Sequence, residues 1–352
     1  MKKKWIVIPS LLVLAVIGAV ATKPMWSPRP AVVLDDAMRL EAIDTLVAKL
    51  NAHYVFPDKA RQIEVVLRQR LKEGKYDAIT DADKLSDQLS EDIDGVAHDK
   101  HMTVFFSPEV LPPDDAMGPP PATRAEWEKQ APLFVRLSSH VSNMGLEKVD
   151  HLGPNIGYLE FSSFAPDFLV SEKYASAMNK LADTDGLIID LRKNGGGVPQ
   201  TVTLLASYLV DQRTRLNDIW ERKTGTTTQQ WTLDKLDGKR YGGKKPVIIL
   251  VGPGTKSAGE DFAYTMQALK RATVIGENTW GGAHPARRFR LGDHLLAVIP
   301  WARTISPITQ SNWEGVGVTP DVAAKPDRAL EVAKEQLQRQ LKSAAPLVAA
   351  GQ

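Results

Sequence analysis

Apolar residues recur at helical spacing through the first part of the chain. The stretch DDAMRLEAIDTLVAKLNAHYV places its apolar side chains on one helical face, and KLSDQLSEDIDGVA repeats the pattern. In the first stretch this face consists of Met38, Leu40, Ile43, Leu46, Val47 and Leu50. We therefore predict a small N-terminal helical bundle in residues 31–105. The prolines of VLPPDDAMGPPPATRAEW then break the pattern, which predicts a proline-rich connecting segment over residues 106–150.

Strand and helix patterns alternate beyond residue 150. Three strand-like stretches each run into a turn and are followed by an amphipathic helix. They are NIGYLEFSSF with SEKYASAMNKLAD, DGLIIDLRKNGGG with PQTVTLLASYLV, and VIILVGPGTK with SAGEDFAYTMQAL. This alternation predicts right-handed crossovers and an α/β core, a sheet with helices packed on it, over residues 151–325. The amphipathic stretch PDRALEVAKEQLQRQLK predicts a last helix in residues 326–352.

The N-terminus has the pattern of a targeting segment. Three lysines precede an apolar run from Trp5 to Ala21, and the run ends in the small-x-small sequence Ala19-Val20-Ala21. This is typical of a bacterial secretory signal, residues 1–21, cleaved after Ala21. The run is also long enough for an uncleaved membrane anchor. Both interpretations place the remaining chain outside the cytoplasm, either periplasmic or extracellular, or tethered to the inner membrane.

Composition excludes several classes of function. The chain of 352 residues is 43% hydrophobic and 24% charged, which is ordinary for a soluble globular protein. A formal net charge of +2 favours no nucleic-acid partner. The absence of cysteine excludes disulfides, thiolate nucleophiles and cysteine-based metal sites.

Two glycine-rich turns follow buried strands of the predicted sheet, at residues 194–197 and 252–257. Binding and catalytic groups collect at the carboxyl ends of strands in such sheets. Ser257 ends the second turn and starts a helix, with Glu260 at the fourth position of a capping box. The local sequence alone is compatible with a helix cap and with a nucleophile. Asp190, Arg192 and Asn194, which alternate along one strand face, are interpreted as supports of the first turn.

Five motifs, in order, resemble one family. GVAHDKHMTVFF, LGPNIGYLEFSSF, GLIIDLRKNGGG, TKSAGEDFAY and WEGVGVTPDV are similar to segments of the tail-specific, or C-terminal processing, serine peptidases. The branch that they resemble contains tricorn protease and the repeats of interphotoreceptor retinoid-binding protein. The resemblance covers most of the chain after residue 31. It implies a ClpP/crotonase-like, ββα-type core sheet with packed helices. The segment between His101 and Asn155 is too short for the PDZ domain that larger members insert.

The resemblance implies that Ser257 is the nucleophile and His101 its base. Tail-specific members use a lysine about two dozen residues after the serine, but no lysine occurs between Lys270 and Lys325. The tricorn-like branch instead uses a histidine of the D-x-H segment, here His101, and a glutamate near the end of the core, here Glu314. An imidazole is suited to accept the serine proton and to return it to the leaving amine.

The remaining site residues are expectations of the same resemblance. The oxyanion would accept hydrogen bonds from an amide of the first glycine turn, Gly196 or Gly197, and from the amide of Ala258. His284 is expected to contact substrate or to act as an alternative base. Tricorn has a serine directly before its catalytic histidine, and this chain has Lys100 there. The connection between His101 and Glu314 then needs another hydroxyl or a water.

The expected function is hydrolysis of peptide bonds through a Ser257 acyl-enzyme, without metal or cofactor, on a peptide or protein substrate. Three alternatives stay open. The same core could bind apolar ligands or peptides without catalysis. An esterase of the α/β-hydrolase type would need Gly-x-Ser-x-Gly, where this chain has Thr255, and a histidine after the serine, His284 or His294. A metal site at 98–101 lacks a clear third ligand.

Overall fold

The structure, a computed structural model, describes residues 32–114, 123–130, 143–153 and 155–344. The predicted signal or anchor, residues 1–21, lies outside the described residues. None of the helices within those ranges is both long and apolar enough to cross a membrane.

Three helices form the N-terminal region, as the periodicity predicts. They are α1 (Asp36–His53), α2 (Pro57–Lys72) and α3 (Ala82–Ala97). Aspartates cap two of them: Asp35 accepts the amide hydrogen of Met38 at 2.8 Å, and Asp81 accepts two amides at the start of α3. The proline that begins α2 stands where a helix needs no amide hydrogen.

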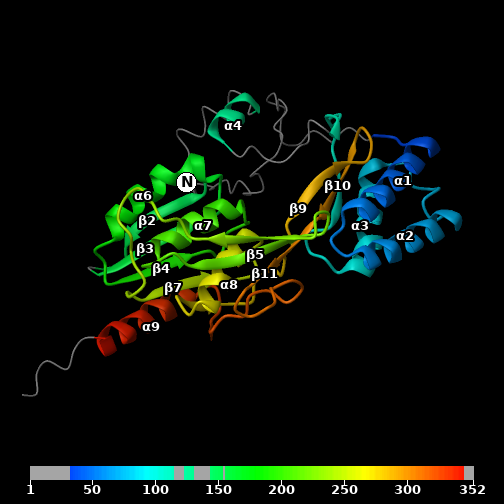
Figure 1. The fold of residues 1–352 in the computed structure, drawn as a ribbon. Coiled ribbons are helices and arrows are strands. Elements are labelled where there is room, and N and C mark those ends of the chain that lie inside the picture. The colour runs from blue at the N-terminus through cyan, green and yellow to red at the C-terminus, as the bar shows by residue number, and fades with distance from the viewer. Residues whose placement is uncertain (1–31, 115–122, 131–142, 154, 345–352) are drawn as a thin grey trace, which may run out of the picture.

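A small sheet from a distant part of the sequence completes the core of these helices. It has the antiparallel order β1-β10-β9, with β1 (Thr103–Phe106), β9 (Ala286–Arg290) and β10 (Leu295–Pro300). Leu295, Ala297 and Ile299 of β10 lie in the same hydrophobic cluster as the buried leucines of α1 to α3. Figure 1 shows the β9–β10 hairpin extending from the central sheet to the helices. The hairpin from the second half of the chain therefore shares one hydrophobic core with the N-terminal helices.

The central sheet has six strands in the order β12-β8-β7-β4-β3-β2. They are β2 (Leu146–His151), β3 (Ile156–Phe161), β4 (Gly186–Asp190), β7 (Val247–Val251), β8 (Thr273–Gly276) and β12 (Val322–Ala323). All pairs are parallel except the antiparallel pair β2–β3. In register, Leu187 of β4 pairs with Val247 of β7, so the two strands end at the same edge.

Helices cover both faces of this sheet (Figure 1). On one face lie α6 (Asp167–Leu181), α7 (Pro199–Tyr208) and α8 (Ala258–Ala268), and on the other α9 (Ala329–Ala344). Because both faces are covered, every residue of β4 and β7 is buried, which explains their continuous apolar sequences. A third sheet has the order β11-β5-β6, with β5 (Arg215–Glu221), β6 (Thr226–Trp231) and β11 (Ala302–Ile305).

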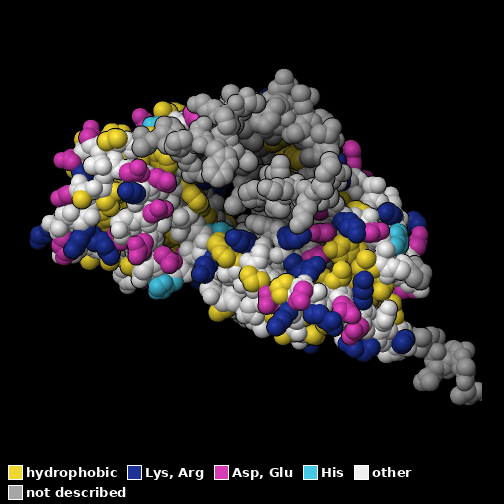
Figure 2. All heavy atoms as spheres, turned by 180° about the vertical axis from the view of Figure 1, so that it is seen from behind, with side chains coloured by type: hydrophobic (Ala, Val, Ile, Leu, Met, Phe, Trp, Pro, Cys, Tyr) yellow, Lys and Arg dark blue, Asp and Glu magenta, His cyan; other side chains and the backbone are white. Residues whose placement is uncertain are grey.

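The predicted fold class, a helical N-terminal region followed by an α/β core, is confirmed. Two elements occur in residues 106–150, which the prolines had assigned to a connecting segment: α4 (Arg124–Gln130) lies inside it, and β2 begins there and ends one residue beyond it. The sequence of β2, LEKVDH, has almost no apolar alternation because β2 is an edge strand with one neighbour and mostly exposed side chains. Over the face shown in Figure 2, acidic and basic side chains are interspersed.

Candidate active site

The two glycine-rich turns meet at one edge of the central sheet, because they follow the neighbouring parallel strands β4 and β7. The hydroxyl of Thr255 donates to the carbonyl oxygen of Leu191 at 2.7 Å, and the amide of Lys256 donates to the carbonyl oxygen of Asn194 at 2.8 Å. Thr255 and Asn194 are fully buried. These bonds hold the turn that carries Ser257 directly against the glycine turn after β4.

Ser257 adopts a backbone conformation that residues with a side chain rarely occupy. Its φ is 51° and its ψ is −118°, outside the allowed regions for a non-glycine residue. Such strain persists only where the surroundings enforce it, and it concentrates at functional sites. Gly196, with φ 99°, leaves the necessary room, because a Cβ there would lie 2.8 Å from the Cβ of Ser257. The side chain of Ser257 thus projects from a sharp turn between β7 and α8.

Two backbone amides next to Ser257 are free to bind an anion. The amide of Gly196 donates to Oδ1 of Asn194 at 2.9 Å and is thereby used. The amides of Gly197 and Ala258 have no hydrogen-bond partner within the described part of the chain. Ala258 is the first residue of α8, where the helix dipole favours negative charge. Of the three amides expected to form an oxyanion hole, Gly197 and Ala258 are therefore the available pair.

Glu260 ties a third loop to the turn that carries Ser257. Its Oε2 accepts the amides of Ser257 at 2.8 Å and of Gly282 at 3.0 Å, which forms the glutamate half of the predicted capping box. Its Oε1 accepts the Gly281 amide and the Thr279 hydroxyl, both at 2.5 Å. Burial raises the pKa of this fully buried carboxyl, and the hydrogen bonds oppose that rise. The sequence indicated the cap but contained no signal for the contacts with residues 279–282.

His101 packs on the loop that Glu260 holds. The imidazole meets the Trp280 indole edge to face, with ring centroids 5.2 Å apart and planes at 89°, and the Trp280 amide donates to the Thr255 carbonyl at 3.2 Å. A Cβ on Gly282 would lie 2.8 Å from Cε1 of His101. His101 therefore packs on a loop that is also bonded to the turn carrying Ser257, and no hydrogen bond joins its ring to the Ser257 hydroxyl within the described ranges.

The imidazole of His101 is held neutral by its surroundings. Burial lowers its pKa to about 4, the charge of Asp99 opposes this, and His284 contributes to it. Its Nδ1 is buried and has no hydrogen-bond partner among the residues that the structure describes. A neutral imidazole can accept a proton, and Nε2 is the nitrogen left to do so.

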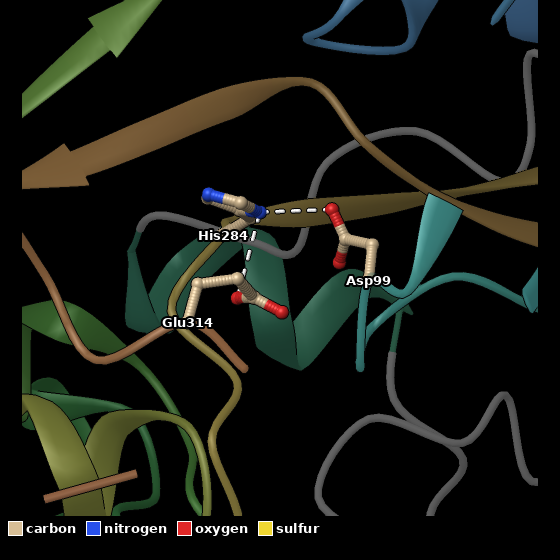
Figure 3. A group of neighbouring side chains, drawn as sticks. All are labelled: Asp99, His284 and Glu314. Carbon is tan, nitrogen blue, oxygen red and sulfur yellow. Dashed lines mark hydrogen bonds and ion pairs between the residues drawn. The ribbon is translucent and has the colours of Figure 1, made fainter. Parts of the chain in front are cut away.

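The side chains of Asp99, His284 and Glu314 converge (Figure 3). Nδ1 of His284 lies 2.8 Å from Oδ2 of Asp99 and 3.4 Å from Oε2 of Glu314. Glu314 also accepts the backbone amide of Lys100 at 3.0 Å and that of Ala283 at 2.5 Å. Burial, and then the nearby charge of Asp99, raise the pKa of Glu314. Glu314 thus contacts the backbone next to His101, and no hydrogen bond joins it to the His101 ring within the described ranges.

The loop carrying Glu314 is bonded to residues 281–282 of the loop on which His101 packs. The indole of Trp313 donates to the Gly282 carbonyl at 2.8 Å, and the Gly315 amide donates to the Gly281 carbonyl at 2.8 Å. His284 is only 4% exposed, with its ring against that of Phe56 at 5.3 Å. The expectation that His284 contacts substrate stays a prediction, because the side chain is buried beside two carboxylates.

A metal ion has one conceivable position among the described residues. The ligand atoms of Asp99, His284 and Glu314 lie within 4.8 Å of one another. Both oxygens of Glu314 already accept backbone amides, and the His284 nitrogen faces both carboxylates directly. His284 hydrogen-bonds to Asp99 and Glu314 accepts backbone amides, which differs from the arrangement of an open coordination site.

Family models match most of the chain. The model of peptidase family S41 matches residues 155–324. The model of the N-terminal domain of peptidase S41 in eukaryotic IRBP matches residues 37–142. The fold and the motifs thus define the class of S41-type serine peptidases, and the chain belongs to peptidase family S41. The resemblance drawn from the five motifs is confirmed.

Individual relatives are distant. The carboxyl-terminal-processing protease of Synechocystis sp. is 28% identical over 172 residues, which is 48% of this chain and 38% of that protein. The tricorn protease of Thermoplasma volcanium is 31% identical over 101 residues, 29% of this chain and 8% of its own. The structure of the photosystem II D1 C-terminal processing protease superposes with a TM-score of 0.53 at 18% identity, covering 88% of this chain and 99% of that one. The matched part of this chain therefore spans well under half the length of these two sequence relatives.

Proposed function

We propose that the protein is a serine peptidase with Ser257 as nucleophile. The observation that carries the proposal is the conformation of Ser257, a strained serine at the start of α8 with the unpartnered amides of Gly197 and Ala258 beside it. A serine that merely capped a helix would adopt the extended backbone of an ordinary cap. Membership of family S41 supports peptide bonds as the target.

The mechanism follows from the groups at the site. Oγ of Ser257 attacks the carbonyl carbon of the scissile bond while its proton passes to Nε2 of His101. The amides of Gly197 and Ala258 donate to the oxyanion that forms, and the positive end of α8 adds to its stabilisation. His101 then gives the proton to the leaving amine, which releases the first product and leaves an ester on Ser257. Water, deprotonated by His101, hydrolyses that ester and regenerates the serine.

Asp99 has a role in this mechanism that the sequence did not assign. The imidazolium forms in a buried place, where charge is costly. The Asp99 carboxylate, whose Oδ1 accepts the His101 amide at 3.2 Å, is the nearby negative charge that raises the pKa of His101. It therefore favours the protonated base in the transition state.

A fluorophosphonate probe tests the nucleophile. The probe should label the wild-type chain and Ser343→Ala, an exposed serine on α9, but not Ser257→Ala. Hydrolysis of a casein-derived peptide mixture, followed by mass spectrometry, should show the same dependence. Labelling that persists in Ser257→Ala would refute the assignment. Folded wild-type protein that is neither labelled nor active would favour a non-catalytic binding protein.

We also propose that the protein works outside the cytoplasm. The proposal rests on the lysine-headed apolar run and the Ala19-Val20-Ala21 ending. In a Gram-negative host, the mature chain should appear in the periplasmic or membrane fraction, and its N-terminal mass distinguishes cleavage after Ala21 from an intact anchor. Full-length protein confined to the cytosol would contradict the proposal.

A further inference from the structure

The tricorn-like arrangement lacks one part in this chain. The side chain before His101 is a lysine, exposed at the surface, and Nδ1 of His101 is buried without a hydrogen-bond partner among the described residues. A catalytic imidazole is normally oriented by a group that binds its second nitrogen. The orientation of His101 therefore has to come from elsewhere.

The backbone around His101 is held by two carboxylates instead. Asp99 Oδ1 accepts the amide of His101 at 3.2 Å, and Glu314 Oε1 accepts the amide of Lys100 at 3.0 Å. One acid belongs to the helical region and the other to the core. Each fixes a peptide plane next to the catalytic side chain, so together they define where the imidazole lies.

The two carboxylates lie close together, and the Tyr54 hydroxyl also donates to Oδ2 of Asp99, at 3.3 Å. Their oxygens lie within 4.8 Å of each other in a mostly buried place, where like charges repel strongly. His284 lies between them, with Nδ1 at 2.8 Å from Asp99 and 3.4 Å from Glu314. This nitrogen therefore links the acid of the helical region, by a hydrogen bond, to the acid of the core, by a longer contact (Figure 3).

We propose that His284 is a positioning residue, which orients His101 through its Nδ1: this nitrogen hydrogen-bonds to Asp99 and lies in contact with Glu314. This inference rests on the proposed function, because it assigns His101 as the base. It gives His284 a role that differs from substrate contact and from acting as an alternative base. The chain thereby orients its base through the backbone, where the tricorn-like branch uses a side-chain hydroxyl.

Two amide variants separate these roles. The side-chain nitrogen of asparagine occupies roughly the position of Nδ1 of histidine, and that of glutamine roughly the position of Nε2. His284→Asn keeps a donor at the position of Nδ1, so its kcat should stay within about tenfold of wild type. His284→Gln and His284→Leu lose this donor. A small misplacement of a catalytic group can lower the rate by about a hundredfold, so their kcat should fall by about that factor while KM stays nearly unchanged. His294→Leu is the matched control. That histidine is partly buried, and its Nδ1 lies 3.0 Å from the carbonyl oxygen of Ser107, in a contact that involves neither Asp99 nor Glu314.

A pH profile gives a readout that loss of packing alone would not move. His284 contributes to the lowered pKa of His101, and Asp99 opposes it. Removing the imidazole in His284→Leu leaves the negative charge of Asp99 less compensated. The acidic limb of kcat/KM should therefore shift to higher pH in His284→Leu and stay in place in His294→Leu.

The outcomes are decisive even where the leucine variant fails to fold, because the Asn and Gln variants can be compared alone. Equal losses in His284→Asn and His284→Gln would overturn the proposal in favour of a base or a substrate contact. Full activity of His284→Leu would also overturn it. Activity that is lost in EDTA and restored by Zn²⁺ would assign the three residues to a metal ion. In each case Ser257→Ala and His101→Ala must be inactive, since activity in those variants would instead refute the proposed function.

Discussion

The backbone strain at Ser257 predicts an unusual order of stability between two inactive variants. At φ 51° and ψ −118°, any residue with a Cβ is strained by about 1–3 kcal/mol, and glycine is not. Alanine gains about 0.4–1 kcal/mol over glycine through the smaller entropy of its unfolded chain. The difference predicts that Ser257→Gly is more stable than Ser257→Ala by about 1 kcal/mol. For a chain of this size, this corresponds to a difference of about 2 °C in Tm.

Urea unfolding followed by tryptophan fluorescence measures this difference, because the chain has 8 tryptophans. The same pair of substitutions at Ser171, inside α6, is the control. There the backbone is helical, so glycine should be the less stable variant by about 1 kcal/mol. Both Ser257 variants should be inactive, which leaves stability as the only difference. If Ser257→Gly were less stable than Ser257→Ala by the amount seen at Ser171, the argument from strain would be wrong.

Three further predictions concern groups around the site. Because burial lowers the pKa of His101 to about 4, kcat/KM should stay constant down to about pH 5 and be half lost near pH 4. A midpoint of the acidic limb of kcat/KM near pH 6.5 would argue against His101 as the base. Thr255→Val leaves the Leu191 carbonyl and the Gly252 amide without their hydroxyl partner. It should lower the free energy of unfolding in urea by about 2–4 kcal/mol, whereas Thr255→Ser, which keeps the hydroxyl, should lower it much less. Burial raises the pKa of Asp261 to about 6, above its unfolded value of 3.8, so its contribution to stability is complete below pH 3.8 and is lost as the pH rises through 6. The free energy of unfolding of Asp261→Asn should therefore rise relative to that of wild type by about 2–3 kcal/mol between pH 4 and pH 8. A difference in unfolding free energy that stayed constant over that range would contradict the raised pKa of Asp261.

The part of the site near Ser257 was predictable because its signals are local. An apolar strand, a glycine turn and a capping box lie within 14 consecutive residues, from Val247 to Glu260. A parallel sheet then brings the two glycine turns to one edge without further information. Which amides stay free was not predictable, because it depends on the Asn194 side chain binding the amide of Gly196.

The distant part of the site depended on the family resemblance. His101 and Glu314 meet through the amide of Lys100, a contact across 214 residues that no local pattern encodes. The role of Glu260 in holding residues 279–282 arises from side-chain geometry and has no signal beyond the cap itself. β2 was missed because an exposed edge strand needs little apolar alternation.

The hairpin β9–β10 makes the helical region inseparable from the remainder of the chain. Leu295, Ala297 and Ile299 are nearly or fully buried in the cluster that also contains the helix leucines, and the Val55 amide donates to the Pro300 carbonyl at 2.9 Å. A fragment that ended before the hairpin would expose the apolar faces of its helices to water. Such a fragment would therefore aggregate or stay molten, and adding the remaining chain as a second fragment should restore a folded complex. The same geometry means that grafting the helices onto another scaffold would require the hairpin to move with them.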